Sequence, residues 1–365
     1  MGSVSAERDG RSGPRRILLV RPSALGDVSR TVPVAASLKR RWPGAELHWL
    51  VNAGMEPVIA AHPAVDRVVP FPRRALAGFG VKGSATRRGL AFARRLRSMR
   101  YDAVYDVQGL ARSGLLTWLT RAPRRVGFAD ARELGWVGCN VRHRVPNDVR
   151  HTVDRMLGLI EADGVEPVRD LSLTVPADDA AWVERFLAEH GLGGGCVAVA
   201  PTARWASKCW PADRFAEVTR RVLDARPAWK AVVLASPDEA ERAAAMVTAL
   251  AERGVAASGE ASRVVRPATS VGQMMAILSR CGLLLCNDSA ALHIAVGLGR
   301  PIAAVFGPTD PAEVGPYGRD DAVAWSNATA EERARYGRDR SDRTLIERVD
   351  VAAVWRIAQR EMGEG

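Results

Sequence analysis

The polar residues of this chain that are best suited to chemistry stand in short segments that follow apolar runs. The first such segment, RPSALGDV at 21–28, follows the apolar run 16–20. Within it, Asp27 carries a carboxylate that can take a proton from a hydroxyl group as a general base, and Gly26 permits close backbone approach. Aspartate is also a favoured helix N-cap, so capping is the alternative role for Asp27.

A second segment, NDSAALH at 287–293, follows the apolar run 283–286. Its small residues would leave free N–H groups at the start of a helix, which is a favourable site for a diphosphate. Asp288 and Ser289 are also suited to ordinary capping of that helix. His293 lies within the expected helix, where a hydrogen-bonded core histidine is the alternative to a role in binding.

Two further polar segments follow apolar runs in the second half of the chain. The loop PTARWASKCWP at 201–211 contains Lys208, whose ammonium group can neutralise a phosphate as a point charge. A solvated loop lysine is the alternative. The segment FGPTDP at 306–311 contains the glycine and prolines that mark a turn.

Each half of the chain alternates short apolar runs with helical patterns, which is typical of a doubly wound α/β sheet. The expected strands are 16–20, 46–51, 65–70, 103–107, 196–200, 230–235, 282–286 and 302–306. The expected helices are 27–41, 87–98, 149–163, 180–189, 214–224, 237–253, 271–279, 290–297 and 344–361. Two such units of similar size predict two Rossmann-like domains that face a central cleft.

The composition limits the class of protein. A length of 365 residues suits two domains, and no apolar run approaches the roughly 18 residues that cross a bilayer. The N-terminus has no signal-peptide pattern and the five cysteines form no CxxC or metal-binding set, so we expect a cytoplasmic protein without a bound metal. The glycines at 191–195 precede a strand, unlike a dinucleotide fingerprint, so a dehydrogenase is not favoured.

Six segments, taken together and in order, resemble one family closely. They are SALGDV at 23–28, HPAVDRV at 62–68, YDAVYDVQGL at 101–110, KCWP at 208–211, NDSAALH at 287–293 and FGPTDP at 306–311. The resemblance is to the ADP-heptose:lipopolysaccharide heptosyltransferases, glycosyltransferase family 9, from about residue 16 to residue 320. It implies the GT-B fold and an inverting, metal-independent transfer of heptose from ADP-heptose to a lipopolysaccharide-core or similar acidic glycan, without a cofactor.

The resemblance also implies a division of labour along the chain. We expect a disordered tail over 1–14, an acceptor-binding domain over 15–175, a donor-binding domain over 176–343 and a closing helix within 344–365. By matching motif, Asp27 would be the catalytic base, Lys208 would hold the donor phosphates and Glu239 the donor ribose. The complete expected donor site is Thr202, Lys208, Glu239, Asp288, Ser289, Ala290, Ala291 and His293.

Two positions depart from the family pattern. Ala290 stands where the family commonly has glycine, and Ala203 stands where some members carry a second hydroxyl residue. The backbone donors at the helix start survive the first change, so these departures bear more on donor identity than on chemistry. A GT-B enzyme with another nucleotide sugar, an epimerase of that architecture and a catalytically silent sugar-nucleotide binder remain as alternatives.

The formal net charge of +11 indicates acidic partners. We expect Arg73, Arg74 and Arg132, within the arginine-rich first half, to contact an acidic glycan or lipid-linked acceptor. The same charge would suit an anionic membrane, so we expect the protein at the inner face of the cytoplasmic membrane. A solvated surface is the alternative. Because the basic residues spread over several α/β units, we expect no nucleic-acid partner.

Overall fold

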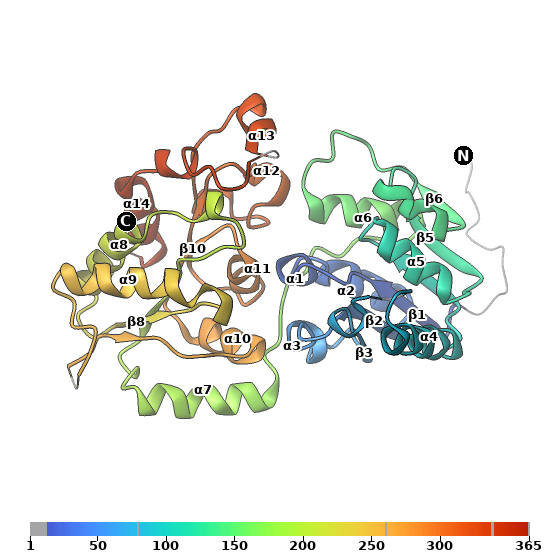
Figure 1. Ribbon diagram of the computed structural model, residues 1–365, viewed down its shortest axis with the longest axis horizontal. Coiled ribbons are helices and arrows are strands. Elements are labelled where there is room, and N and C mark those ends of the chain that lie inside the picture. Colours follow the sequence, from blue (N-terminus) through green and yellow to red (C-terminus); the bar gives the residue numbers. More distant parts are fainter. Residues whose placement is uncertain (1–12, 79, 260, 337–338, 364–365) are drawn as a thin grey trace, which may run out of the picture.

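The structure is a computed structural model that describes residues 13–78, 80–259, 261–336 and 339–363. The expected tail over 1–14 lies outside these residues except for Gly13 and Pro14. Two bodies, each built on a six-stranded sheet, lie side by side, with α1 (Leu25–Ser29) and α11 (Ala290–Gly297) at their junction (Figure 1). The expected fold class, two doubly wound Rossmann-like domains, is confirmed.

The first sheet has the strand order β3-β2-β1-β4-β5-β6, and all neighbouring strands run parallel. The strands are β1 (Arg16–Val20), β2 (Glu46–Asn52), β3 (Arg67–Phe71), β4 (Ala103–Asp106), β5 (Arg124–Phe128) and β6 (Val141–His143). Besides α1, the helices are α2 (Val32–Arg41), α3 (Pro57–Ala60), α4 (Gly83–Ser98), α5 (Ala111–Leu119) and α6 (Thr152–Ala162), with 3-10 segments η1 (Arg74–Leu76) and η2 (Arg132–Gly138).

The second sheet repeats this topology, with the order β12-β11-β10-β7-β8-β9 and parallel neighbours. The strands are β7 (Cys196–Ala200), β8 (Lys230–Val233), β9 (Val264–Val265), β10 (Leu283–Asn287), β11 (Ile302–Phe306) and β12 (Val323–Trp325). The helices besides α11 are α7 (Ala177–Glu189), α8 (Ala212–Ala225), α9 (Ala240–Glu252), α10 (Val271–Arg280), α12 (Pro311–Val314), α13 (Ala330–Tyr336) and α14 (Val351–Glu361). The 3-10 segments are η3 (Ala206–Lys208), η4 (Pro237–Glu239), η5 (Asp320–Ala322) and η6 (Ile346–Arg348).

The central strands read as continuous apolar runs because helices cover both faces of each sheet. In β1, Leu18, Leu19 and Val20 are fully buried, and all five residues of β10 are buried as well. Each such side chain contributes about 1.5–3 kcal/mol relative to exposure. This burial fixes the strand ends from which the polar segments at 21–28 and 287–293 emerge.

The prediction of one helix over 27–41 is wrong, because the chain forms α1 and then α2. Pro33 lies in the first turn of α2 and has no N–H to donate to the preceding turn. Proline is tolerated at the start of a helix but not in its interior, so a new helix begins there. The break leaves α1 as a short, separate helix that carries Asp27.

Four strands and several short helices were not anticipated from the sequence. β5 starts with two arginines, and β6, β9 and β12 have three, two and three residues, so none gives a long apolar signal. At the other end of the chain, α14 packs on α8 and beside β11 in the second domain. Among the described residues, no helix combines the length and the apolar character needed to cross a membrane.

Candidate functional site

Both sheets reverse their winding direction at one pair of neighbouring strands, β1 with β4 and β7 with β10. In open α/β sheets, ligands bind beyond the carboxyl ends of the strands at this switch point. Asp27 follows β1, Thr202 and Lys208 follow β7, and Asp288 follows β10. The fold therefore gathers most of the residues that the sequence singled out at two switch points.

Asp27 is held by two arginines that sequence reasoning did not identify. Its Oδ1 forms ion pairs with the guanidinium groups of Arg30 and, at 3.3 Å, of Arg21. Its Oδ2 accepts a hydrogen bond from the backbone N–H of Ala24 at 3.1 Å, so Asp27 caps α1 from the third helical position, while the N-cap residue itself is Ala24. The side chain remains 26% exposed. The three-residue spacing from Asp27 to Arg30 on a helix was the available sequence signal.

The charge state of Asp27 follows from these neighbours. Burial by itself would raise the pKa of the carboxyl group, but the positive charges of Arg21 and Arg30 outweigh it and lower the pKa to about 2. Asp27 is consequently an anion at neutral pH. It combines an ionised carboxylate with partial access to solvent.

A cavity of 450 Å³ opens beside Asp27. Five arginines and three carboxylates line it, together with Gln108, Gly109 and apolar residues; the charged residues are Arg21, Arg30, Arg132, Arg150, Arg155, Asp27, Asp130 and Glu313. The Nε atoms of Arg21 and Arg30 are buried without a hydrogen-bond partner. The lining therefore has an excess of positive charge, and two of its arginines each have a buried N–H group without a hydrogen-bond partner.

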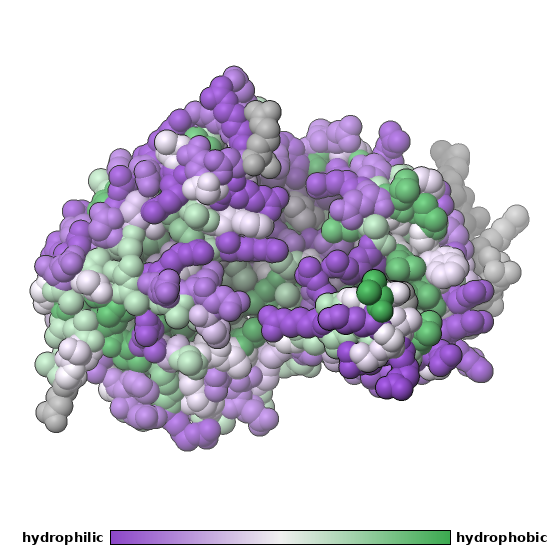
Figure 2. Space-filling view, viewed as in Figure 1, coloured by the Kyte–Doolittle hydropathy of each residue, from purple (hydrophilic) through white to green (hydrophobic). Residues whose placement is uncertain are grey.

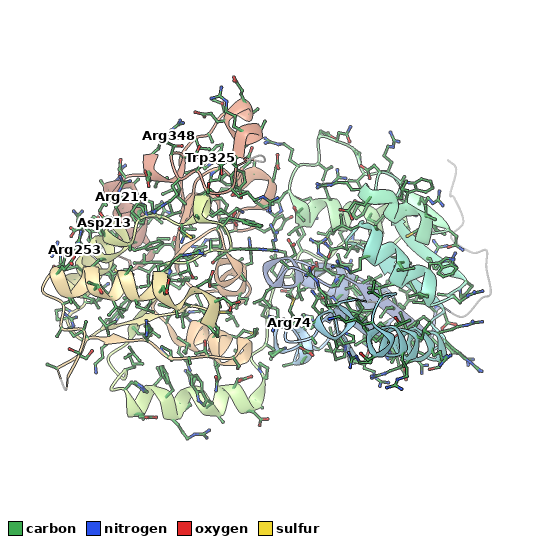
Figure 3. The ribbon with its side chains drawn as sticks, viewed as in Figure 1. Arg74, Asp213, Arg214, Arg253, Trp325 and Arg348 are labelled. Carbon is green, nitrogen blue, oxygen red and sulfur yellow. The ribbon has the colours of Figure 1, made fainter. Side chains whose placement is uncertain are left out.

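The three arginines that we expected to contact an acceptor do not lie together. Arg132 lines this cavity at the start of η2, after β5. Arg73 and Arg74 follow β3, at the opposite edge of the first sheet, and neither lines the cavity. Figure 3 labels Arg74 in the first domain.

On the second domain, Lys208 and Asp288 form an ion pair with 2.5 Å between Nζ and Oδ2. The hydroxyl group of Thr309 donates to the same oxygen at 2.8 Å. Burial would raise the pKa of Asp288, but Lys208 reverses the effect and keeps it below its ordinary value. Thr309 belongs to the FGPTDP segment at 306–311, for which the glycine and prolines predict a turn and no contact with Asp288.

The start of α11 has the features of an anion site. Ser289 is its N-cap residue, and its Oγ is buried without a partner. Ala290 and Ala291 are the first two helical residues, whose N–H groups have no partner within a helix. Thr202, which follows the end of β7 and precedes Lys208 in the same loop, is buried. Ser289, Ala290 and Ala291 therefore lie at the end of α11 where the helix dipole is positive.

Asn287 links the two polar segments that follow β7 and β10. Its Nδ2 donates to the carbonyl oxygen of Pro201 at 2.8 Å, and its Oδ1 accepts from the N–H of Trp210 at 3.0 Å. The side chain is fully buried. The loop that carries Lys208 is thus anchored at both ends to the end of β10.

His293 lies where the two domains meet. A Cβ atom on Gly26 would approach the His293 ring to 2.8 Å and the Cα atom of Ala290 to 3.3 Å, so only glycine allows α1 this close to α11. Burial and the charge of Arg30 lower the pKa of His293 to about 3, so the ring is neutral. It is 6% exposed, as a core histidine would be, but it lies close enough to both Asp27 and Asp288 to interact with their charges.

Glu239 stands apart from this cluster, after β8. Its Oε2 accepts hydrogen bonds from the hydroxyl group of Ser236 at 2.7 Å and from the N–H of Ser236 at 3.3 Å. This capping box opens η4 and orients the carboxylate at the carboxyl edge of the second sheet. The side chain is half-buried.

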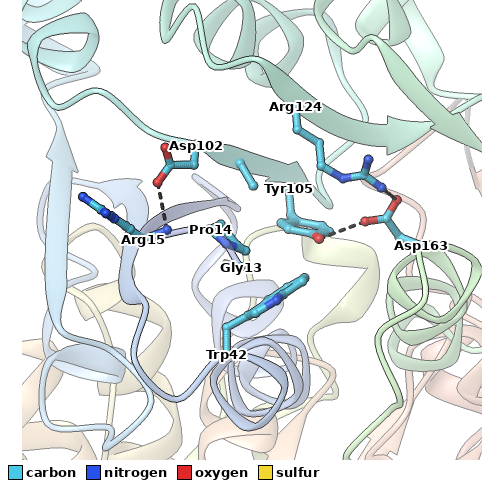
Figure 4. Close-up of a pocket in the computed structure, with 9 residues that line it drawn as sticks. Gly13, Pro14, Arg15, Trp42, Asp102, Tyr105, Arg124 and Asp163 are labelled. Carbon is cyan, nitrogen blue, oxygen red and sulfur yellow. Dashed lines mark hydrogen bonds and ion pairs between the residues drawn. The ribbon is translucent and has the colours of Figure 1, made fainter. Parts of the chain in front are cut away.

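A second hollow, of 500 Å³, lies at the amino ends of β1, β4 and β5, on the edge opposite to Asp27 (Figure 4). Its carboxylates are paired with neighbouring groups of the hollow. Asp163 accepts from Tyr105 at 2.8 Å and from Arg124 at 2.5 Å, and Asp102 accepts from the N–H of Arg15 at 2.9 Å. These contacts hold neighbouring elements of the first domain together, so a structural role accounts for the paired residues.

Comparison with known proteins agrees with this geometry. The crystal structure of a glycosyl transferase family 9 protein from Veillonella parvula superposes with a TM-score of 0.78 at 21% identity, covering 96% of this chain and 98% of that one. An Escherichia coli heptosyltransferase, WaaC with ADP-2-deoxy-2-fluoro heptose, gives 0.71 at 24% identity over 94% and 99%. These likenesses establish the GT-B fold of glycosyltransferases.

The sequence comparisons define the family. Lipopolysaccharide heptosyltransferase 1 of E. coli strain K12 is 29% identical over 316 residues, which is 84% of this chain and 92% of that protein. The corresponding protein of Pseudomonas aeruginosa is 29% identical over 313 residues, 83% and 82%. The pattern of glycosyltransferase family 9 (heptosyltransferase) matches residues 89–341. The chain belongs to this family and is a glycosyltransferase.

Proposed function

We propose that this chain is an inverting, metal-independent transferase that moves a heptose from ADP-heptose to a lipopolysaccharide-core or similar acidic glycan. One observation carries the proposal: α1, which bears the ionised Asp27, packs directly on the start of α11, which bears the unpartnered donors of the second domain. An acceptor bound beside Asp27 would thus lie next to a donor bound at α11.

The donor side supplies positive charge where a nucleoside diphosphate would leave. Lys208 and the first N–H groups of α11 can stabilise the departing diphosphate by preorganised electrostatics. The relatives are heptosyltransferases, and the E. coli structure holds an ADP-heptose analogue. We therefore propose ADP-heptose as the donor; another nucleotide sugar is the second candidate because Ala290 departs from the family pattern.

Asp27 would receive the proton of the attacking hydroxyl group. A carboxylate with a pKa of about 2 is a weak base towards a free alcohol. However, the acceptor oxygen becomes strongly acidic as it bonds to an anomeric carbon with oxocarbenium character, so a weak base suffices late in the step. Attack from the Asp27 side, opposite to the leaving diphosphate, would invert the configuration.

The cavity beside Asp27 favours an anionic acceptor. Its arginines outnumber its carboxylates by five to three. Such an excess of guanidinium groups suits carboxylate or phosphate groups on a sugar. We propose that the acceptor is lipid-linked and that the protein acts at the inner face of the cytoplasmic membrane.

Two measurements test this function in sequence. A thermal-shift panel of ADP-, GDP-, UDP- and CDP-sugars should show the largest stabilisation with the ADP-sugar. Transfer from ADP-heptose to an acidic core acceptor, followed by NMR of the product in the presence of EDTA, should give the inverted anomer at an undiminished rate. Loss of activity on chelation with recovery on Mg²⁺ would contradict metal independence, and stabilisation by the ADP-sugar without any transfer would favour a silent binder.

A further inference from the structure

The large apolar side chains that stand exposed within the described residues are all in one stretch of the first domain. They are Val81, Leu90, Leu115, Trp118, Leu134 and Val137, which are 47% to 88% exposed. They belong to the start of α4, to α4 itself, to α5 and to η2. We call the surface formed by these three elements the α4–α5 face.

The three elements adjoin one another. Helices α4 and α5 are in contact, and η2 packs on α5 through glycines. A Cβ atom on Gly114 of α5 would lie 2.2 Å from the carbonyl oxygen of Gly135 in η2, so the two backbones touch. In Figure 2, green hydrophobic residues lie among purple hydrophilic ones over this part of the first domain. The elements that carry the exposed side chains therefore form one continuous part of the first domain.

This surface is also strongly basic. From Arg73 to Tyr101 the sequence has nine basic residues and no acidic one. Within the described part of the chain, none of the nine forms an ion pair with a carboxylate. Four arginines line a hollow of 660 Å³ at the ends of α4 and α5, namely Arg94, Arg97, Arg100 and Arg121. The one acid there, Asp102, is occupied by backbone N–H groups at 2.9 Å.

Apolar and basic side chains alternate along the same helix faces. On α5, Arg112, Leu115 and Trp118 are all exposed and follow at three-residue intervals, so each adjoins the next on the helix surface, and the exposed Arg121 follows just past the helix end. The guanidinium group of Arg121 lies 5.4 Å from the centre of the Trp118 ring. Glu133 of η2 is the acid closest in sequence to the exposed Leu134, and it accepts from the N–H of Ala111 at 3.4 Å.

We propose that the α4–α5 face docks on the surface of an anionic lipid bilayer. The arginines would contact headgroup phosphates, each adding attraction within the Debye length. Leu115, Trp118 and Leu90 would enter the boundary between headgroups and acyl chains, where tryptophan and leucine are favoured. A soluble polyanion such as a nucleic acid would engage the arginines but would gain nothing from the exposed leucines and tryptophan. The combination of both kinds of side chain therefore selects the membrane.

The docking surface leads to the acceptor cavity. η2 begins at Arg132, which lines the cavity beside Asp27, and continues to the exposed Leu134 and Val137. η2 thus connects the α4–α5 face to the cavity, whereas the arginine-lined hollow at Asp102 lies at the opposite edge of the sheet. The suggested purpose of membrane docking, delivery of a lipid-linked acceptor, rests on the proposed function. Binding of the bilayer itself does not depend on sugar transfer.

Flotation with lipid vesicles tests the docking directly on the full chain. Wild-type protein should float with vesicles of phosphatidylcholine containing about a third phosphatidylglycerol, and not with phosphatidylcholine alone. The pair Leu115→Ser with Trp118→Ser, and separately Arg94→Glu with Arg97→Glu, should each lower the bound fraction about tenfold or more. The control Arg185→Glu, on exposed α7 of the second domain, should bind like wild type.

Two further readouts keep the result decisive. All variants should keep the wild-type melting temperature and ADP-induced shift, since the substituted side chains are exposed and outside the cleft. Wild-type vesicle binding by either double variant would overturn the proposal. Binding of duplex DNA by the same variants gives a second comparison. The proposal would also be overturned if the arginine variant lost DNA binding as much as vesicle binding while the Leu115 and Trp118 variant lost neither, since the face would then be a general polyanion site. Vesicle binding without any sugar transfer would contradict the proposed function alone.

Discussion

At the scale of single residues, the charges to which we assign the chemistry are already paired with other charges of the protein. Asp27 is paired with Arg21 and Arg30, and Lys208 with Asp288. Removing one partner therefore leaves the other charge uncompensated, which changes the local field as well as the contact. A substitution at one of these positions is therefore expected to act through the residue itself and through the partner that it leaves unpaired.

The Lys208–Asp288 pair gives a prediction for donor binding. Lys208→Ala should weaken ADP binding about ten- to a hundredfold, because a charge-assisted contact is lost and Asp288 then faces the diphosphate unpaired. Adding Asp288→Asn to that variant should restore about three- to tenfold, since the repulsion is removed. Isothermal titration with ADP measures both steps, and adenosine should bind the Lys208 variant like wild type. A double variant that binds ADP no better than Lys208→Ala would contradict the electrostatic account.

A second residue-scale prediction concerns stability at different pH. Asp106 ends β4, its Oδ1 accepts from the N–H groups of Gln108 and Gly109 at 3.0 and 3.1 Å, and burial raises its pKa to about 6. Because this pKa is raised above the unfolded value, the protein loses stability as pH rises towards 6. Asp106→Asn can keep both hydrogen bonds without a buried charge. Its unfolding free energy relative to wild type should rise by about 2 kcal/mol between pH 4 and pH 8, as urea titrations would show; an unchanged difference would exclude the raised pKa.

At the scale of elements, the long buried strands and the helices after them could be predicted, and the contacts between them could not. β7 and β11 were placed at their observed bounds from apolar runs alone. β6 and β12 could not be placed, because three residues carry no period. The positions of Asp27, Lys208 and Asp288 followed from strand ends. The partner Thr309 did not, because the pattern of apolar runs does not show that the ends of β10 and β11 adjoin, and Arg21 did not, because the direction of its side chain cannot be read from its position after β1.

The contact between α1 and α11 yields an element-scale prediction. Gly26→Ala should place a Cβ atom 2.8 Å from His293 and force the two helices apart. Since a shift of about 1 Å between reacting groups can cost a hundredfold, kcat should fall about ten- to a hundredfold while ADP affinity stays unchanged. Gly44→Ala is the matched control, because nothing lies within 4 Å of a Cβ atom there. Equal kcat values for the two variants would show that the close approach is not needed.

At the scale of the whole molecule, a few polar contacts join the two domains around the cleft. Arg30 donates to the carbonyl oxygen of Val314 at 3.0 Å, Arg150 pairs with Asp310 at 2.7 Å, and Tyr317 donates to Asp154 at 2.6 Å. Arg30 thus contacts both Asp27, the proposed base, and the second domain. Thr309 donates to Asp288 of the Lys208–Asp288 pair. The next residue, Asp310, contacts Arg150 of the first domain.

These contacts predict that the domains stay associated through the Asp310 carboxylate. Asp310 is buried and also lies 3.3 Å from Arg333, so Asp310→Ala leaves two arginines without their shared anion. We expect a larger radius of gyration by small-angle X-ray scattering and a fall in transfer of about tenfold or more. Glu313→Ala, whose carboxylate is 55% exposed and 4.0 Å from Arg150, serves as the control. A variant as compact as wild type would show that Asp310 acts only within its own domain.

The central claim is that a carboxylate of the first domain takes the acceptor proton while the second domain holds the donor. The rate of transfer by Asp27→Asn, measured at saturating ADP-heptose and acceptor, tests this most directly. We predict a fall in kcat of about 10²- to 10⁴-fold, with ADP affinity within about twofold of wild type, because Asp27 lies outside the donor domain. Asp130→Asn, which lines the same cavity, should keep most of the activity. Wild-type turnover by Asp27→Asn would mean that this carboxylate only caps α1 and that the account of the reaction is wrong.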